Sequence, residues 1–428
     1  MIQEIKIKNF RSFKDEVTFS FEASNDKFAE DSQVVQINEN VRLLRFAVVY
    51  GYNASGKSNL LDAIDFLRFF WSYKPDDLDE GTKVTPFKLD QTSSNEPVRF
   101  ELVFYVESTK YWYQLELDTQ QVYFEKLSYY KSTQPIMLFE RTLKDEYSVI
   151  EFNNNGNGDK ISIAAKDIMN VNCLKNLSFF VARNQVNVSL PLIDAAKNWM
   201  KTQIMPAIYP TTNLTNYAQR RASEDTNITR HIVDFLHEAD FNITNILSNV
   251  VSKELSNETI QFLLEDKDTP VIEKERLKKE KTIKQIRTVF EHTVENENGK
   301  EAYHLNRGDE STGTLRTFGL ETALYEAVNS NSLLPIDEVE TSLHPKLLEK
   351  ILFEYLKTLS RSQVIVATHN DGLLDLVDDL IRKDSVWFTE KKKSGVTDLY
   401  KLTDFRGVNR LSSIRDAYRN KRFGATMN

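Results

Sequence analysis

One eight-residue stretch, GYNASGKS from Gly51 to Ser58, constrains the fold of this chain more than any other. It has the form G-x-x-x-x-G-K-S, which is typical of the phosphate-binding loop of nucleotide hydrolases. The apolar run RLLRFAVVY precedes it and indicates a buried strand, and NLLDAIDFLRFF follows it with apolar residues at helical spacing. Strand, glycine-rich loop and helix are the context that the motif requires. We therefore prefer a phosphate-binding loop to the alternative, a chance match.

This loop predicts a site for a nucleoside triphosphate. Backbone N–H groups and a helix N-terminus surround and attract negative charge. Lys57 would reach the β- and γ-phosphates, and the Ser58 hydroxyl would ligate magnesium. The residues of this segment that we expect to contact the nucleotide are Gly51, Asn53, Ala54, Ser55, Gly56, Lys57, Ser58 and Asn59.

Composition places the chain among globular proteins of about two or three domains, with 428 residues and a mean hydropathy of −0.46. No apolar run approaches the ~20 residues of a membrane span, and no secretory signal is visible, so we expect a cytoplasmic protein. The single cysteine, Cys173, excludes an internal disulfide framework. A net charge of −8 argues against nonspecific coating of DNA, although it does not exclude a local basic groove.

Periodicity divides the rest of the chain into strand-rich and helix-rich parts. Strands are expected at 2–8 and 17–23, and an antiparallel meander is expected from the runs 98–106, 111–118 and 121–130. A low-complexity turn at 153–160 predicts a boundary. Helices are then expected at 190–204, 228–240 and 243–255. The basic run 274–287 is interpreted as a solvated helix face, with contact to nucleic acid or a partner as the alternative.

The second half of the predicted site begins near residue 301. The run SLLPIDEVE, 332–340, is apolar and ends in the adjacent carboxylates Asp337 and Glu338. In nucleotide hydrolases an Asp at the end of a parallel strand, the Walker B Asp, holds magnesium. A neighbouring carboxylate can orient or deprotonate the attacking water. A strand end that merely carries acids is the alternative.

Three further motifs appear in a fixed order around these carboxylates. Ser311, Gly313 and Thr314 open an amphipathic helix about 20 residues before them. The loop TSLHP, 341–345, follows them directly. A strand, SQVIVATHN, then ends at His369, which in this context is interpreted as a sensor of the γ-phosphate.

This order of motifs resembles the ABC-type ATPase heads of the SMC, RecF and double-strand-break-repair class. More narrowly, it resembles the AAA-type ATP-binding proteins of prokaryotic defence loci, the RloA/AbiLi group, with PtuA, AriA and the overcoming-lysogenization-defect ATPases as relatives. IKIKNFRSFKDEVTFSF at the N-terminus, PFKLD at 86–90, RKDSVWFTEK at 382–391 and the closing YRNKRFGA carry the narrower resemblance. The resemblance covers both ends of the chain strongly and its middle only loosely.

The resemblance implies an ATP site that a second copy of the chain completes. The signature helix of one head, through Ser311, Gly313 and Thr314, would face the γ-phosphate bound by the other. By the same resemblance Asn53 matches the asparagine of the phosphate loop, and Arg11 matches an arginine that approaches nucleotide. His369 matches the switch histidine, and Ser342 to His344 match the loop that crosses to the partner site.

This chain also departs from the usual pattern. Its signature replaces L-S-G-G-Q/E with E-S-T-G-T, which weakens a transporter-like interpretation but matches the defence-type relatives. The glutamine of the Q-loop has no secure position, and Gln91 is a candidate. NRGD at 306–309 approximates the guanine-reading motif of GTPases, but it lacks the lysine, so we expect adenine. No nuclease domain follows the head, so the effector chemistry is expected on another polypeptide.

Taken together, these features predict an α/β P-loop NTPase with a split ABC/SMC-type head, an antiparallel β lobe and a helical insertion. We expect the head from 1–152 and 301–428 and a mainly helical insertion from 153–300. The predicted function is an ATP-hydrolysing, magnesium-dependent switch that dimerises through its heads and controls a separate antiviral effector such as a nuclease. A DNA recombination or repair ATPase of the RecF/SMC kind is the alternative, and DNA is its predicted partner.

Overall fold

A computed structural model describes residues 1–75, 77, 79–153, 158–239, 241–266 and 271–426. The chain forms two compact units. Unit 1 contains Met1–Thr211, Glu326–Thr341 and Ile351–Asn428, and unit 2 contains Thr212–Tyr325 and Ser342–Lys350. Both ends of the chain therefore build unit 1. The assignment of a head and an insertion with limits at 152 and 300 stays a prediction, and residues 154–157 of the predicted boundary turn lie outside the described residues.

A five-stranded sheet in unit 1 joins the two halves of the predicted site. Its order is β14–β15–β5–β16–β17, with the first four strands parallel and β17 antiparallel to β16. The strands are β5 (Phe46–Tyr50), β14 (Leu333–Ile336), β15 (Gln363–Thr368), β16 (Val386–Lys391) and β17 (Thr397–Lys401). Every residue of β5, β14 and β15 is buried, as expected for parallel strands covered on both faces. The phosphate loop and the carboxylates thus follow strands of one sheet, which confirms the α/β P-loop fold.

A seven-stranded antiparallel sheet forms the β lobe of unit 1, in the order β10–β9–β8–β7–β6–β1–β2. The predicted meander is confirmed, and the sheet extends it at both edges. The strands are β1 (Ile2–Lys8), β2 (Val17–Ser20), β6 (Val98–Val106), β7 (Thr109–Leu117), β8 (Val122–Tyr130), β9 (Pro135–Lys144) and β10 (Tyr147–Phe152). Alternate side chains along β6 and β7 are buried, because one face of this sheet covers the core. A separate hairpin pairs β3 (Val34–Asn38) with β4 (Val41–Leu44).

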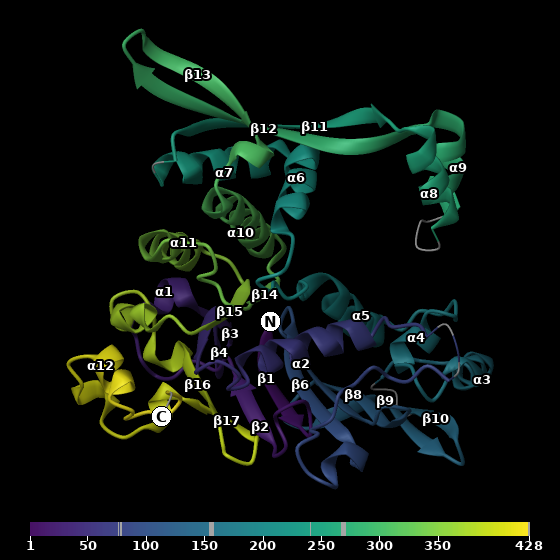
Figure 1. The fold of residues 1–428 in the computed structure, drawn as a ribbon. Coiled ribbons are helices and arrows are strands. Elements are labelled where there is room, and N and C mark those ends of the chain that lie inside the picture. The colour runs from purple at the N-terminus through teal and green to yellow at the C-terminus, as the bar shows by residue number, and fades with distance from the viewer. Residues whose placement is uncertain (76, 78, 154–157, 240, 267–270, 427–428) are drawn as a thin grey trace. The chain divides into compact units, whose positions relative to one another are not determined.

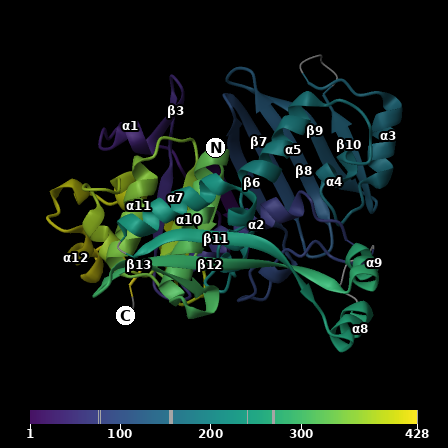
Figure 2. The same cartoon turned by 90° about the horizontal axis from the view of Figure 1, so that it is seen from above.

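The helices of unit 1 pack on these sheets. They are α1 (Glu30–Gln33), α2 (Lys57–Phe70), α3 (Ile163–Asn172), α4 (Phe179–Arg183), α5 (Pro191–Gln203) and α12 (Ile414–Arg419). Helix α2 buries the apolar face that the sequence predicts, including Leu60, Ile64 and Leu67. Seen from above, α5 lies over the β lobe (Figure 2), and Trp199 stacks on Phe104 of β6 with ring centroids 4.2 Å apart.

Unit 2 combines helices with a long antiparallel ribbon. Its elements are α6 (Leu214–Glu224), α7 (Thr226–Glu238), β11 (Ile243–Glu254), α8 (Asn257–Glu265), α9 (Val271–Glu280), β12 (Thr282–Asn296) and β13 (Gly299–Asn306). Strand β12 pairs with both β11 and β13, and α6 and α7 contact β11 (Figure 1). Two further helices have residues assigned to each unit: α10 (Thr312–Ser330) and α11 (Pro345–Lys357). Among the described residues no helix is long and apolar enough to cross a membrane.

The prediction of a helix at 243–255 is wrong, because this segment forms β11. Its apolar residues recur at a spacing that also fits a helix, but its valine, isoleucine, threonine, serine and asparagine residues favour helices poorly. The partner strand decides the outcome. β12 pairs with β11 from Ile243 to Glu254, and Ser248 shares a 2.8 Å hydrogen bond with Thr288 across the pair. The basic run 274–287 is likewise helical only to Glu280 and then enters β12.

A buried ion pair fastens the segment around α4 to the β lobe. Arg141 on β9 and Glu125 on β8 are both fully buried, with Arg141 Nη1 3.2 Å from Glu125 Oε2. Arg141 also donates to the Leu174 carbonyl at 2.8 Å. Glu125 accepts from the Ser178 hydroxyl at 2.6 Å and from the Phe179 N–H at 2.7 Å. Each ion is thus satisfied by several partners, which such a buried pair requires.

We predict that Arg141→Met destabilises the protein by about 3–5 kcal/mol, because it leaves the buried Glu125 carboxylate without its cation. The matched control is Arg99→Met, which removes the cation of the exposed Arg99–Glu116 pair and should cost about 0–1 kcal/mol. Urea unfolding of both variants measures the difference. Equal losses would show that the buried pair does not anchor this lobe.

Candidate nucleotide-binding site

The phosphate loop between β5 and α2 has a backbone that requires glycine at two positions. Gly56, the residue before α2, has φ +110°, and a Cβ there would lie 2.7 Å from Thr397 Cγ2. A Cβ on Gly51 would lie 2.3 Å from Ser55 Oγ. Contacts under 3.0 Å are not tolerated, and φ in this region is strained for other residues. Asn53 and Ala54 at the crest of the loop are exposed.

The β16–β17 hairpin supports this loop. Ser55 Oγ shares a 2.7 Å hydrogen bond with Thr389 of β16, and Thr397 of β17 donates to the Ser55 carbonyl at 2.8 Å. The Tyr52 hydroxyl donates to the carbonyl of Lys391 at 2.7 Å. The sequence does not predict this contact, because no local pattern relates residue 389 or 397 to residue 55.

Two residues predicted to contact the nucleotide, Ser55 and Asn59, form side-chain hydrogen bonds with other residues of the protein. Ser55 is fully buried in the contact with Thr389. Asn59 donates to Ser12 Oγ at 2.6 Å, which links α2 to the turn after β1. The Ser55 N–H donates to the Tyr52 carbonyl at 3.0 Å and the Asn59 N–H to the Gly56 carbonyl at 3.1 Å. The contact of both residues with a nucleotide stays a prediction.

Lys57 and three carboxylates lie near one another in the site. Lys57 is buried, and its Nζ donates to the Gly51 carbonyl at 2.8 Å. Burial holds the pKa of Lys57 below its ordinary value. The negative charges of Asp337, Glu340 and Glu338 oppose this shift only in part. The lysine of the loop and the carboxylates after β14 are therefore brought together from positions about 280 residues apart in the sequence.

The carboxylates follow β14 on a strained turn. Asp337 is buried, and its N–H donates to the Ile208 carbonyl at 2.7 Å. Glu338 has φ +44°, a left-handed conformation that costs a non-glycine residue about 1–3 kcal/mol. Its N–H donates to Asp337 Oδ1 at 3.1 Å. Such strain gathers at functional sites, where the surrounding structure imposes it.

Glu340 holds the strand end that carries His369. Its Oε1 lies 3.0 Å from His369 Nδ1 and accepts from the His369 N–H at 3.0 Å. Its Oε2 accepts from the Thr368 hydroxyl at 2.8 Å. Our reading of the sequence assigned Glu340 no role, although it lies in the same run as Asp337 and Glu338. That run, IDEVE, is the only local signal for it.

Arg11 contacts the site through Asp62. Its Nη1 lies 2.6 Å from Asp62 Oδ2, and the Tyr209 hydroxyl donates to Asp62 Oδ1 at 2.5 Å. Burial raises the pKa of Asp62, and Tyr209 and Arg11 oppose this shift. Asp62 is four residues after Ser58 on α2 and therefore on the same face of the helix. That spacing could have identified Asp62, whereas no sequence pattern points to Tyr209.

The predicted signature residues open α10 in unit 2. Ser311 Oγ accepts from the Thr314 N–H at 3.0 Å, so Ser311 caps the helix. A Cβ on Gly313 would lie 3.2 Å from the Ser342 carbonyl, which places the 341–345 loop against this helix start. The predicted helix N-terminus is confirmed, and its role in a partner's site stays a prediction.

The structure also places Gln91, the Q-loop candidate, and the NRGD segment at 306–309. Gln91 lies in an exposed turn beside Asp90, which pairs with Lys14 at 2.8 Å. In NRGD, Asn306 and Asp309 cap a single 3-10 turn with reciprocal side-chain hydrogen bonds. This local role accounts for both polar residues of the motif without a guanine base.

The residues present fit a nucleotide with magnesium. The glycines allow the loop to pack closely on Thr389 and Thr397. The loop leads directly into α2, which begins at Lys57, and a helix N-terminus favours a bound phosphate. Magnesium in nucleotide sites uses one or two carboxylates, substrate phosphates and waters. Ser58 and the buried Asp337 supply that kind of donor set.

Comparison with known proteins agrees with this geometry. A family model described as "AAA domain, putative AbiEii toxin, Type IV TA system" matches residues 46–167 and 209–375. A search of curated protein sequences found no match. The chain is similar to the SMC head domain from Thermotoga maritima, with 14% identity, 94% of this chain and 98% of that chain covered, and a TM-score of 0.40. It is also similar to an SmcHead bound to the C-winged helix domain of ScpA, with 14% identity, coverage of 98% and 99%, and a TM-score of 0.44.

The family model covers well over half of the chain and includes the phosphate loop, the carboxylates after β14 and His369. The likeness to the SMC heads is too distant to add to the argument. On its motifs, its fold and this match, the chain belongs to the family of ATPase-type AAA domains described as putative AbiEii toxin, Type IV TA system.

Proposed function

We propose that this protein is an ATP-hydrolysing molecular switch whose site is completed by a second copy of the chain. The observation that carries the proposal is that the loop of Lys57 and the carboxylates Asp337, Glu338 and Glu340 follow β5 and β14, two parallel strands of one sheet. Lysine on a phosphate loop and carboxylates at a neighbouring strand end are the two halves of a phosphoryl-transfer site.

Each residue of the site has a role in this proposal. The loop N–H groups and Lys57 bind the phosphates, while Arg11 and Asn53 contact the nucleotide at the rim. Ser58 and Asp337 would hold magnesium, which would supply positive charge to the phosphates. Glu338 accepts a proton from the attacking water. His369 donates a hydrogen bond to the γ-phosphate, and Glu340 positions His369 through the contacts described above.

The signature helix is proposed to act on the site of a partner. Ser311, Gly313 and Thr314 form a capped helix start, and such a start attracts an anion. If the γ-phosphate of one protomer lies between its own loop and this helix of the other, ATP closes the dimer and hydrolysis opens it. The γ-phosphate then becomes a conformational signal.

We further propose that the switch acts in antiviral defence in the cytoplasm and controls a separately encoded effector such as a nuclease. The family description, which names a putative AbiEii toxin of a type IV toxin–antitoxin system, supports this direction. Co-purification with the product of an adjacent gene, and toxicity that requires both, tests it. Hydrolysis stimulated by duplex DNA alone would instead support a recombination or repair ATPase.

Lys57→Ala is expected to abolish detectable ATP binding, because the phosphates lose their buried cation. Isothermal titration calorimetry with Mg-ATP measures the ATP affinity. The control is Lys131→Ala, which removes an exposed lysine between β8 and β9. Affinity equal to the unmodified protein would refute the phosphate-loop assignment.

Glu338→Gln is expected to bind ATP normally, to hydrolyse it about 10²–10⁴-fold more slowly and to accumulate as a dimer, because only the proton acceptor is lost. Steady-state phosphate release and light scattering with ATP measure both effects. Turnover at the rate of the unmodified protein would exclude Glu338 as the base.

Glu340→Ala is expected to lower kcat with little change in KM and to add nothing to the loss caused by His369→Ala. The reason is that a positioning residue acts through the residue it orients, so the two effects are not additive. A double-mutant cycle on kcat measures this, and fully additive losses would show that Glu340 acts independently of His369.

A further inference from the structure

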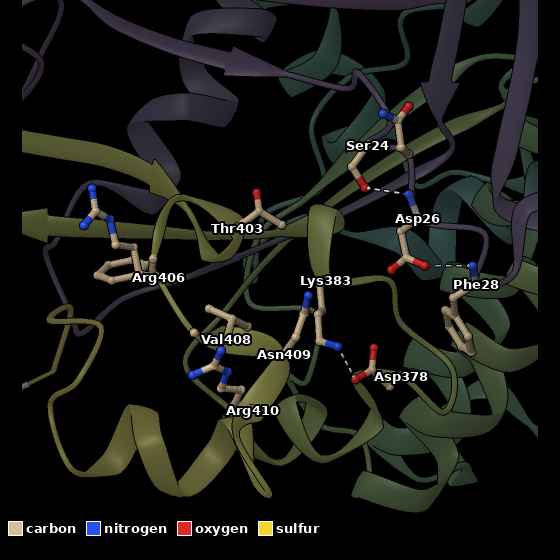
Figure 3. Close-up of a pocket in the computed structure, with 13 residues that line it drawn as sticks. Ser24, Asp26, Phe28, Asp378, Lys383, Thr403, Arg406, Val408, Asn409 and Arg410 are labelled. Carbon is tan, nitrogen blue, oxygen red and sulfur yellow. Dashed lines mark hydrogen bonds and ion pairs between the residues drawn. The ribbon is translucent and has the colours of Figure 1, made fainter.

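A groove at the C-terminal side of unit 1 belongs to no part of the ATP site. It has a volume of about 1120 Å³ (Figure 3). This exceeds the ~300–1,000 Å³ of pockets that enclose a single small ligand. Three chain segments line it: Ser24–Phe28, the stretch from Asp378 to Lys383, and Thr403–Arg410. Its size and shape suit part of a longer polymer rather than one small molecule.

Buried side chains of Arg382 and Asp384 hold the wall formed by Ser24–Phe28 in place. Arg382 is fully buried and donates to the carbonyls of Asp26 and Phe28 and to the carboxylate of Asp384. The hydroxyl and the N–H of Ser24 donate to the same carboxylate at 2.7 and 2.8 Å. Burial raises the pKa of Asp384, but these hydrogen-bond partners hold that pKa below its ordinary value. The groove is therefore a built feature and not a gap between mobile loops.

Unpaired cations surround the groove in a chain that is acidic as a whole. Between Arg406 and Arg422 six residues are arginine or lysine and one is acidic. Arg415 and Arg419 are neutralised by Asp371. In the part of the chain that the structure describes, no ion pair or side-chain hydrogen bond joins the remaining four, which are all exposed: Arg406, Arg410, Lys421 and Arg422.

These cations are near the groove. Arg406 and Arg410 line it, and Arg422 Nη2 lies 3.6 Å from where a Cβ of Gly407 would be. The lining also contains two carboxylates, Asp26 and Asp378, and the latter is paired with Lys383 at 2.6 Å. Figure 3 shows this pair on the wall between the other two segments. The cations without partners that line the groove, Arg406 and Arg410, are thus arginines, whose planar guanidinium suits phosphate.

Aromatic rings and free amides complete the lining. Phe28 and Phe405 are half-buried, and Phe405 is held edge-on by Tyr400 and Phe423 at 5.5 and 5.1 Å. The side chains of Asn25 and Asn409 are exposed, and within the described residues they make no hydrogen bond. Rings stack on bases, amides read base edges and arginines bind phosphates, whereas an acidic peptide would need only the cations.

We propose that this groove binds a single-stranded nucleic acid, with Arg406 and Arg410 on the phosphates and Phe28 and Phe405 against the bases. The groove is also linked to the phosphate loop by chain connectivity. Lys383 lies three residues before the start of β16, and Thr403 lies two residues after the end of β17. That hairpin contacts Ser55 through Thr389, which lies three residues after the start of β16 and therefore about 10 Å along the strand. This inference goes beyond the proposed switch and does not require ATP hydrolysis.

The test measures binding of fluorescein-labelled 20-nucleotide oligo-dT and oligo-U to the full chain by anisotropy at several salt concentrations. Arg406→Ala/Arg410→Ala is expected to weaken binding at least tenfold. It should also reduce the slope of log affinity against log salt by about 1.4, because each lost phosphate contact in a single strand contributes ~0.7. The matched control is Lys74→Ala/Lys131→Ala, two exposed lysines outside the groove, which should change neither quantity.

A second variant keeps the proposal testable. Phe28→Leu preserves apolar volume, removes the stacking ring and should weaken binding at least fivefold with an unchanged salt slope. Tighter binding to either oligonucleotide decides between DNA and RNA. The proposal fails if neither oligonucleotide binds, or if the arginine variant binds like its control. It also fails if a polyglutamate peptide binds as tightly and Phe28→Leu changes nothing, because the groove would then dock an acidic peptide.

Discussion

The parallel pairing of β15 with β5 is the interaction on which the site depends. It aligns Val364–Thr368 with Phe46–Tyr50, and β14 then joins the sheet through β15. The chain between these strands is about 300 residues long, but closing a long loop costs little more than closing a shorter one, about 0.6 kcal/mol for each doubling. The buried apolar strands offset that entropy. The carboxyl ends of these parallel strands can then carry a lysine from one half of the chain and carboxylates from the other.

Support from outside the motifs sets the geometry of this edge. Thr389 and Thr397 contact Ser55 beneath the phosphate loop, and Ile208 bonds to Asp337 beside β14. The positive φ of Glu338 is tolerated because the backbone is held on both sides: the Asp337 N–H donates to Ile208, and the Val339 N–H donates to the Ala367 carbonyl at 3.3 Å. The strain is thus a property of the assembled sheet and not of the residues IDEVE alone.

Much of the fold follows from local patterns. Helix α2, the meander, α10 and the strands on either side of the site are predicted by apolar periodicity and flanking residues, which act over a few positions. The segment 243–254 was mistaken for a helix because its spacing of apolar residues fits two periods, and only pairing with β12 selects the strand. Likewise, no local signal indicates that Asp62 joins Arg11 to Tyr209, since these three residues come from distant segments.

The amino-acid sequence alone determined the chemistry of the site: a phosphate loop with its lysine and serine, an aspartate–glutamate pair after an apolar strand, and a histidine after another. Each of these is a short pattern whose meaning depends on neighbouring residues. Tertiary structure alone decided that Glu340 holds His369, that the hairpin of β16 and β17 supports the loop, and that the free arginines at 406 and 410 line one groove. These are contacts between residues that are far apart in sequence, and only the packing of the whole chain creates them.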